Sequence, residues 1–185
     1  MPFTRLRTAF LAAALAASAS LAVAQDNPMV GGAPMFASKN IVENAVNSKD
    51  HTTLVAAVKA AGLVNTLQSA GPFTVFAPTN AAFNRLPAGT VDTLLEKKNK
   101  AMLTKVLTAH VVAGDLSGAT LMKRAKANGG SYNMQTVSGD ALSAVVRDGK
   151  LYLIDESGGA ARVTIADVNQ SNGVIHVVNR VLLPK

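Results

Sequence analysis

The segment TVFAPTNAAF, from Thr74 to Phe83, places a strand, a stop and a helix start next to one another. Its first residues are β-branched, aromatic or small and apolar at successive positions, which is typical of a strand covered on both faces. Pro78 ends such a strand because proline has no N–H group to pair. Thr79 or Asn80 can then accept hydrogen bonds from the first N–H groups of a helix. The segment therefore predicts a buried strand that leads directly into a helix.

A second apolar segment, NGVIHVVNRVLLP, runs from Asn172 to Pro184. Gly173 allows a turn before it. Because side chains alternate along a strand, Val174, His176 and Val178 share one face. The other face carries Ile175, Val177 and Asn179. The segment predicts a second strand with apolar residues on both faces.

In the rest of the chain, the spacing of the apolar residues changes near residue 130. Before it, apolar residues recur at helical spacing behind capping residues such as Thr52, Asn99 and Ser117. After it, five segments have the composition of strands, and Asp148-Gly149 between two of them is a strong hairpin signal. These segments are 132–137, 141–147, 151–155, 161–168 and 174–183. Helices followed by antiparallel strands predict an α+β domain.

The N-terminus has the order of a secretory signal peptide. Arg5 and Arg7 precede an apolar run over residues 8–23, which ends in the small-x-small site Ala22-Val23-Ala24. A transmembrane anchor would need about 20 strongly apolar residues, whereas this run is rich in alanine and interrupted by serine. We expect cleavage after Ala24, and a mature protein that works in the periplasm or is secreted.

Residues 25–39 are rich in Gly, Pro, Met and Ala without a period, which predicts a flexible leader. Residues 40–185 are then expected to form one domain. Removing residues 1–24 from the 185 leaves 161 residues. A chain of this length can form one hydrophobic core without disulfides or a structural metal ion. The absence of cysteine excludes disulfides and thiolate metal sites.

The net charge of the mature chain indicates which classes of partner it can attract. The formal charge of +7 includes Arg5 and Arg7, so the mature chain carries about +5. A basic excess favours acidic glycans or the negative surface of a membrane. Nucleic acid is not expected, because the chain has no Trp, only two Tyr and no basic run interleaved with stacking aromatics.

Together, the two apolar segments resemble the two conserved boxes of the fasciclin domain family, at Thr74–Phe83 and Asn172–Pro184. Leu107–Val112, LTAHVV, is similar to the family's central box with its histidine, and Leu86–Thr90 fits the loop after the first box. The similarity runs from about residue 40 to residue 184. It suggests a small secreted, single-domain bacterial fasciclin protein.

The resemblance implies a wedge of mostly antiparallel strands with helices packed along it. It also implies non-catalytic adhesion to a cell surface, matrix or glycan. The family-box residues, expected to be mainly structural, are Thr74, Phe76, Pro78, Thr79, Asn80, Phe83, His110, Asn172, Gly173, His176 and Asn179. Two positions depart from the family pattern: Ala109 stands where Tyr usually precedes the central histidine, and Asn179 where Asp is frequent. The receptor-binding role linked to Tyr-His in animal members is therefore not carried over.

The three histidines, His51, His110 and His176, lack metal-ligand spacing. His51 follows Asp50 at a helix start, where a solvated or capping role is expected. His110 and His176 lie in apolar runs and are expected to be core residues, although the fold could also bring them into one site. We predict no metal site.

Catalytic signatures are missing as well. The eleven carboxylates show no converging pair of the kind a glycosidase needs, and Asp155-Glu156 before Ser157 resembles turn chemistry. There is no nucleophile elbow, phosphate loop or dinucleotide motif. We predict no enzyme, catalytic residue or cofactor. The alternatives kept open are a hydrolase of envelope polymers and a carrier of a small apolar ligand.

A group of lysines, Lys97, Lys98, Lys100 and Lys105, gathers near one expected helix and is here called the lysine group. A solvated helix face would explain it without any function. The functional interpretation is a patch that faces acidic partners, and it is our candidate interaction surface.

Overall fold

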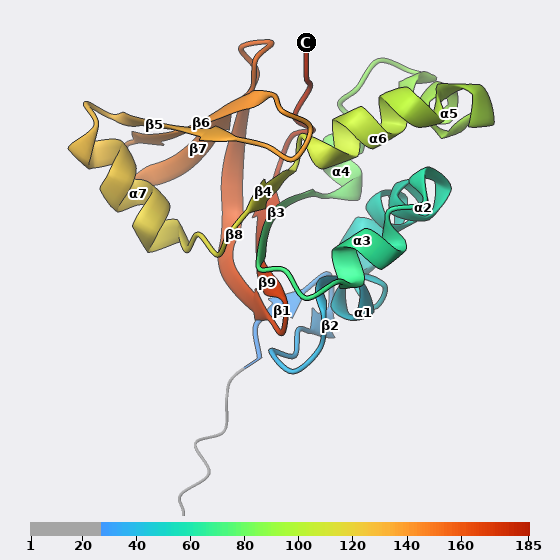
Figure 1. Ribbon diagram of the computed structural model, residues 1–185, viewed down its shortest axis with the longest axis horizontal. Helices are drawn as coiled ribbons and strands as arrows, with labels where there is room; N and C mark the ends of the chain where they lie inside the picture. The colour runs from blue at the N-terminus through green and yellow to red at the C-terminus, as the bar shows by residue number, and fades with distance from the viewer. Residues whose placement is uncertain (1–26) are drawn as a thin grey trace, which may run out of the picture.

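A seven-stranded sheet organises the protein, as the computed structural model of residues 27–185 shows (Figure 1). Its strand order is β4-β3-β9-β8-β7-β6-β5, and only β3 and β9 run parallel among the neighbouring pairs. The strands are β3 (Phe73–Pro78), β4 (Val111–Ala113), β5 (Ser131–Gln135), β6 (Ala141–Arg147), β7 (Lys150–Ile154), β8 (Ala160–Gln170) and β9 (Gly173–Val178). A separate hairpin pairs β1 (Met29–Val30) with β2 (Ala33–Pro34).

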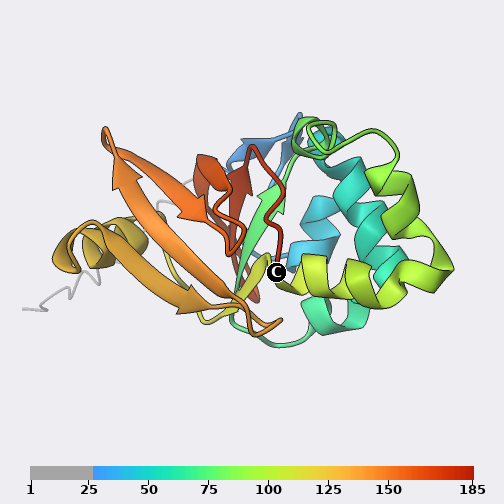
Figure 2. The ribbon, with the colours of Figure 1, turned by 90° about the horizontal axis from the view of Figure 1, so that it is seen from above.

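The helices lie in two places relative to this sheet. Helices α1–α6 pack on one side, and α7 lies at the opposite end against the strands β5–β7 (Figure 2). The helices are α1 (Ile41–Ala45), α2 (Thr52–Ala61), α3 (Val64–Gln68), α4 (Asn80–Phe83), α5 (Thr90–Leu95), α6 (Lys100–Thr108) and α7 (Gly118–Ala127). Two 3₁₀ turns, η1 (Lys49–His51) and η2 (Lys97–Asn99), precede α2 and α6. The expected α+β class and the mostly antiparallel wedge are confirmed.

Local chemistry accounts for most element boundaries. Asn40 and Glu43 form a capping box at the start of α1, and Thr79 and Ser117 accept hydrogen bonds from the first turns of α4 and α7. Gly62 ends α2 in the left-handed conformation, as is common at helix C-termini. Asp148-Gly149 forms the predicted β6–β7 turn, with φ values of 49° and 71°.

Two apolar cores lie on opposite faces of β3 and β9. Val75 and Ile175 face the larger core under α1–α6, whereas Phe76 and Val178 face a smaller core shared with Leu121 of α7. Burial on both faces explains why the two strands are almost continuously apolar in sequence.

Two elements differ from the sequence-based expectation. The segment 25–39 was expected to be a flexible leader, but its described part forms the β1–β2 hairpin and buries Met35 in the larger core. Its last residues are tied down by Asn44, which accepts a 3.0 Å hydrogen bond from the N–H of Phe36 and donates one of 2.8 Å to its carbonyl. Strand β4 was not predicted from the sequence, and it pairs with β3.

Candidate interaction surface

The two conserved boxes lie side by side in the middle of the sheet. Strand β3 carries the first box and β9 the second, paired in parallel register so that Phe76 is opposite His176. The two rings stack with centroids 5.6 Å apart. Gly173 is required at the entry to β9, since a Cβ there would lie 2.0 Å from the carbonyl oxygen of Phe73.

Most polar residues of the boxes are engaged in internal hydrogen bonds. Asn172 accepts from the N–H of Ile41 at 3.0 Å, and its amide donates to the carbonyls of Leu67 and Ser69 at 2.8 and 2.9 Å. Asn80 likewise joins α4 to η1 and the start of α2 through three hydrogen bonds. These side chains act as connectors between segments that are distant in sequence. The structural role expected of them from the family resemblance fits this geometry.

His110 is a buried structural histidine. Its Nδ1 lies 2.8 Å from the carbonyl oxygen of Val106, and its Nε2 accepts a 2.9 Å hydrogen bond from the N–H of Leu182. Because Nε2 is an acceptor, the ring is the neutral tautomer with the proton on Nδ1. Burial lowers the pKa of His110 from 6.5 to about 4.

His176 has the opposite tautomer. Its Nε2 donates to the carbonyl of Leu116 at 2.8 Å, and its Nδ1 accepts a 3.2 Å hydrogen bond from the N–H of Asp167. Burial again lowers the pKa, although the hydrogen bond to Leu116 opposes this effect. With its two ring nitrogens engaged by the main chain, His176 has no group left for a site shared with His110.

His51 corrects the expectation of a solvated residue. Its side chain is buried in η1, where Nδ1 lies 2.8 Å from the hydroxyl oxygen of Ser48. The Nε2 atom has no hydrogen-bond partner among residues 27–185. Burial lowers the pKa of His51. The side chain was misassigned because helix-start residues are usually exposed, whereas η1 is held against the β1–β2 turn by a hydrogen bond from the N–H of Lys49 to the carbonyl of Gly31.

An apolar cavity of about 80 Å³ lies beside His51, between helices α1–α3 and strands β3 and β9. It is the space that a carrier of an apolar ligand would use. An engineered apolar cavity of about 150 Å³ holds a single benzene molecule. The observed cavity has about half that volume, so in this conformation it offers little room for a ligand.

The lysine group is exposed but is not a uniform face. Lys97 and Lys98 lie in η2, and Lys98 forms a 2.7 Å ion pair with Glu96. Lys100 begins α6 and extends toward Gly62 at the end of α2. Lys105 lies in the last turn of α6.

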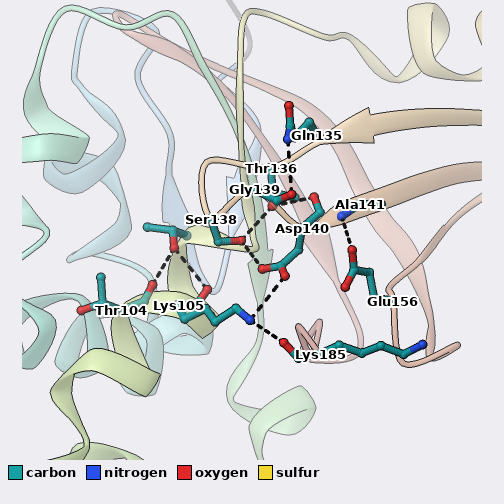
Figure 3. Close-up of polar contacts among 11 residues, drawn as sticks. Thr104, Lys105, Gln135, Thr136, Ser138, Gly139, Asp140, Ala141, Glu156 and Lys185 are labelled. Carbon is teal, nitrogen blue, oxygen red and sulfur yellow. Dashed lines mark hydrogen bonds and ion pairs between the residues drawn. The ribbon is translucent and has the colours of Figure 1, made fainter.

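Figure 3 shows Lys105 between the β5–β6 turn and the C-terminal segment. Its Nζ lies 3.5 Å from a carboxylate oxygen of Asp140 and donates to the main-chain oxygen of Lys185. Asp140 also accepts a 2.5 Å hydrogen bond from Ser138. Lys105 therefore links α6 to the sheet, while Lys97, Lys98 and Lys100 stay together at the start of the helix.

A second cationic surface was missed by the sequence analysis. A cleft of about 480 Å³ opens where β7 and β8 meet the ends of both boxes, and we call it the arginine cleft. Its cationic side chains are Arg85, Arg162 and Arg180, and Asn179 lies among them. Arg85 lies two residues after the end of the first box, and Arg180 lies within the second. That adjacency was the available signal, but only strand pairing adds Arg162 to the same cleft.

The described residues contain no metal-binding cluster and no membrane-spanning helix. Among residues 27–185 no three His, Cys, Asp or Glu side chains are grouped so that they could hold a metal ion. None of the helices in that range has the length and hydropathy needed to cross a bilayer. The predicted signal peptide lies outside the described residues.

Comparison with known proteins identifies the family. A fasciclin domain model matches residues 49–184. Protein sll1483 of Synechocystis sp. is 43% identical over 182 residues, covering 98% of this chain and 94% of that protein. The cell surface glycolipoprotein MPB83 of Mycobacterium bovis is 31% identical over 189 residues, covering 99% of this chain and 78% of that protein.

The fold is similar to that of a solved structure. The FAS1 domain pair from the insect cell adhesion molecule fasciclin I matches 78% of this chain with a TM-score of 0.70 at 19% identity. The chain spans 51% of that solved chain, which contains two domains. The family model, the relatives and the shared fold agree with the box residues quoted from the sequence. The chain belongs to the fasciclin domain family.

Proposed function

We propose that this protein is a secreted or periplasmic, non-catalytic adhesion module that contacts a cell surface, matrix component or acidic glycan. The observation that carries the proposal is the burial of the conserved boxes. Their histidines are neutral and engaged with the main chain, and Asn80 and Asn172 connect internal segments. The groups left to act on a partner are therefore surface groups, and most of their charge is positive.

The two alternative functions receive less support. A hydrolase of envelope polymers would need acids or a histidine at a cleft, and the lining of the arginine cleft includes neither. A carrier would need a larger cavity than the one beside His51. Relatives described as a cell surface glycolipoprotein and a cell adhesion molecule favour adhesion. No cofactor, metal or nucleic acid enters the proposal.

The location follows from the N-terminal sequence. Cleavage after Ala24 would release a chain that begins at Gln25 and has no apolar anchor in residues 27–185. Intact-mass analysis of protein from the native envelope checks this cleavage site. A full-length mass in that fraction would contradict it.

The lysine group is the proposed contact for acidic partners. Lys97, Lys98 and Lys100 lie at or before the N-terminus of α6, where the helix dipole disfavours cations by about 0.3–1 kcal/mol each. Positions that cost folding energy are better explained by binding than by stability. The same helix end also attracts anions, so the dipole and the lysines act in one direction on a partner.

The test compares two variants of equal charge. One changes Lys97, Lys98, Lys100 and Lys105 to Gln. The control changes four exposed lysines elsewhere, Lys49, Lys123, Lys126 and Lys150, to Gln. Adhesion to native-source cells and acidic glycans is measured over a salt series. We expect binding to fall with salt, because exposed charges are screened beyond about 10 Å at 0.1 M, and to fall further in the first variant. Adhesion that is unchanged by salt and equally strong in the first variant would contradict the proposal that the lysine group is the contact surface.

A further inference from the structure

The arginine cleft is assembled around one residue, Asn179, through its side chain and its main chain. Tyr152 on β7 pairs in register with Arg162 on β8. The N–H of Arg162 donates to the Oδ1 of Asn179 at 2.8 Å, and the N–H of Asn179 donates back to the Arg162 carbonyl at 3.2 Å. The carbonyl of Asn179 in turn accepts a 2.9 Å hydrogen bond from Nη1 of Arg85. Three segments far apart in sequence thus converge on a single residue.

The guanidinium groups of this cleft form no ion pair within residues 27–185. Within residues 27–185 the ion pairs closer than 4.0 Å are Lys98–Glu96 and Lys105–Asp140, so none of the three guanidinium groups has a carboxylate partner. Like charges gathered in one cleft repel one another, and a cleft lined by one sign of charge concentrates its field. An anion bound there would relieve the repulsion.

Asp155 is the carboxylate that comes near Arg180, and it is already engaged. It is buried, one oxygen accepts from Ser157 and from the N–H of Gly159 at 2.6 and 2.7 Å, and the other accepts from the N–H of Leu183 at 2.9 Å. Its role is to hold the C-terminal segment against the sheet. Asp155 lies near Arg180 but forms no ion pair closer than 4.0 Å with it, so no carboxylate takes up the guanidinium donors of the cleft.

We propose that the arginine cleft binds the carboxylate or sulfate groups of an acidic polysaccharide. Guanidinium groups are planar and present several N–H donors in a fork that matches a carboxylate or sulfate oxygen pair. The cleft volume, about 480 Å³, lies within the roughly 300–1,000 Å³ typical of ligand pockets. It is large enough for a sugar unit with its acidic substituent.

The uncharged walls favour a sugar over a bare inorganic anion. Leu86, Pro87 and Leu183 line the cleft together with Tyr152, which offers an aromatic ring beside the cations. Apolar walls with a few converging polar groups suit a ligand that is apolar on its ring faces and acidic at one substituent. This inference rests on the proposed adhesion function, and it adds a ligand class and a second contact surface to it.

The experiment uses the mature chain and three probes: an oligogalacturonate, a sulfated dextran oligosaccharide and a neutral dextran oligosaccharide. Calorimetry gives affinity and stoichiometry. Tyrosine fluorescence gives a local signal, because the chain has no Trp and two Tyr, of which Tyr152 lines the cleft. We expect 1:1 binding of at least one acidic probe with a change in fluorescence, and none of the neutral probe. The acidic probe that binds distinguishes carboxylate from sulfate recognition.

Matched variants test the residues. Arg162→Gln should weaken the acidic probe roughly tenfold or more, since a charged hydrogen-bonding group is lost. Arg124→Gln removes the same charge from α7 and should change affinity less than about twofold. Asn179→Asp keeps the oxygen that accepts from Arg162 but places a negative charge in the cleft, so binding should be lost while the far-UV spectrum stays unchanged.

The outcomes separate the two proposals. An equal loss of affinity for the acidic probe in Arg162→Gln and Arg124→Gln would show unspecific charge attraction. It would overturn the proposal that the arginine cleft is the binding site. Inorganic phosphate binding as tightly as the oligosaccharide would overturn the polysaccharide assignment. If the arginine-cleft variants bind the acidic probes normally while the variant with four lysines changed to Gln fails to adhere, the cleft proposal is overturned. The adhesion proposal then stands. If wild type binds neither native cells nor any acidic probe, both proposals fail.

Discussion

The conserved boxes and the cationic surfaces of this protein use their polar groups in opposite ways. In the boxes, Asn172 makes three hydrogen bonds to main-chain groups, and His176 makes two. In the arginine cleft, three guanidinium groups have no carboxylate partner within residues 27–185. The buried residues of the boxes thus build the fold, whereas binding is proposed for cationic surface residues, of which only Arg180 lies within a box.

The comparison predicts a clean division between stability and binding. Variants of buried box residues such as Asn172 should lower the free energy of unfolding and leave the affinity of the folded protein for acidic ligands unchanged. Variants in the lysine group or the arginine cleft should do the reverse, since surface substitutions usually change stability by less than about 0.5 kcal/mol.

The largest effect is expected for Asn172→Ala. The substitution removes an acceptor from the N–H of Ile41 and a donor from the carbonyls of Leu67 and Ser69. Each buried group left unsatisfied costs about 1–3 kcal/mol, so we expect a loss of about 3 kcal/mol or more. Urea unfolding measures it. Asn47→Ala, which removes one exposed hydrogen bond to the carbonyl of Glu43, is the control. Similar losses in both variants would contradict the connecting role of Asn172.

His110 should make the fold sensitive to acid. Its pKa is lowered to about 4 in the folded chain and is 6.5 when solvated. Between these values the unfolded chain binds the proton and the folded chain does not, so stability rises with pH across this window. From pH 7 down to pH 4 this residue alone should reduce the free energy of unfolding by about 3 kcal/mol.

The measurement is urea unfolding at a series of pH values. His110→Gln, which cannot titrate, should be less stable at pH 7 but should show a shallower decline toward pH 4. An identical pH slope in wild type and variant would mean that His110 does not contribute to the acid sensitivity.

The boxes could be predicted from sequence because their determinants are local. Pro78, Thr79 and Gly173 act within a few residues of themselves, and so do the Asp148-Gly149 turn and the Gly62 helix end. The α+β class and the approximate positions of most strands followed from such signals and from alternation, although the last strand was predicted to reach residue 183 and ends at Val178. The order of the strands in the sheet, by contrast, was not predicted.

The features that were not predicted depend on distant partners. The β1–β2 hairpin has no period of its own and is held by burial of Val30 and by Asn44. The arginine cleft combines side chains from residues 85, 162 and 180, and no property of any one segment indicates that they meet. Sequence charge alone pointed to the lysine group, because its members are close together in the chain.

The smallest of the expected stability effects concerns His51. It tests whether this residue belongs to the core or to the surface. Sequence position favoured an exposed residue, for which His51→Ala would have little effect. The structure predicts a loss of about 2 kcal/mol, because the Ser48 hydroxyl loses its partner and the neighbouring cavity of about 80 Å³ grows. His176→Ala should cost a similar amount or more, since it leaves the Leu116 carbonyl and the Asp167 N–H without their partner.

Thermal unfolding of the two single variants beside wild type decides between these expectations. His51→Asn adds a further distinction, because it restores polarity to the site but not the volume of the ring. If packing dominates, His51→Asn should remain close to His51→Ala in stability. If the hydrogen bond with Ser48 dominates, it should recover toward wild type. A His51→Ala variant as stable as wild type would show that this side chain is not part of the core in solution.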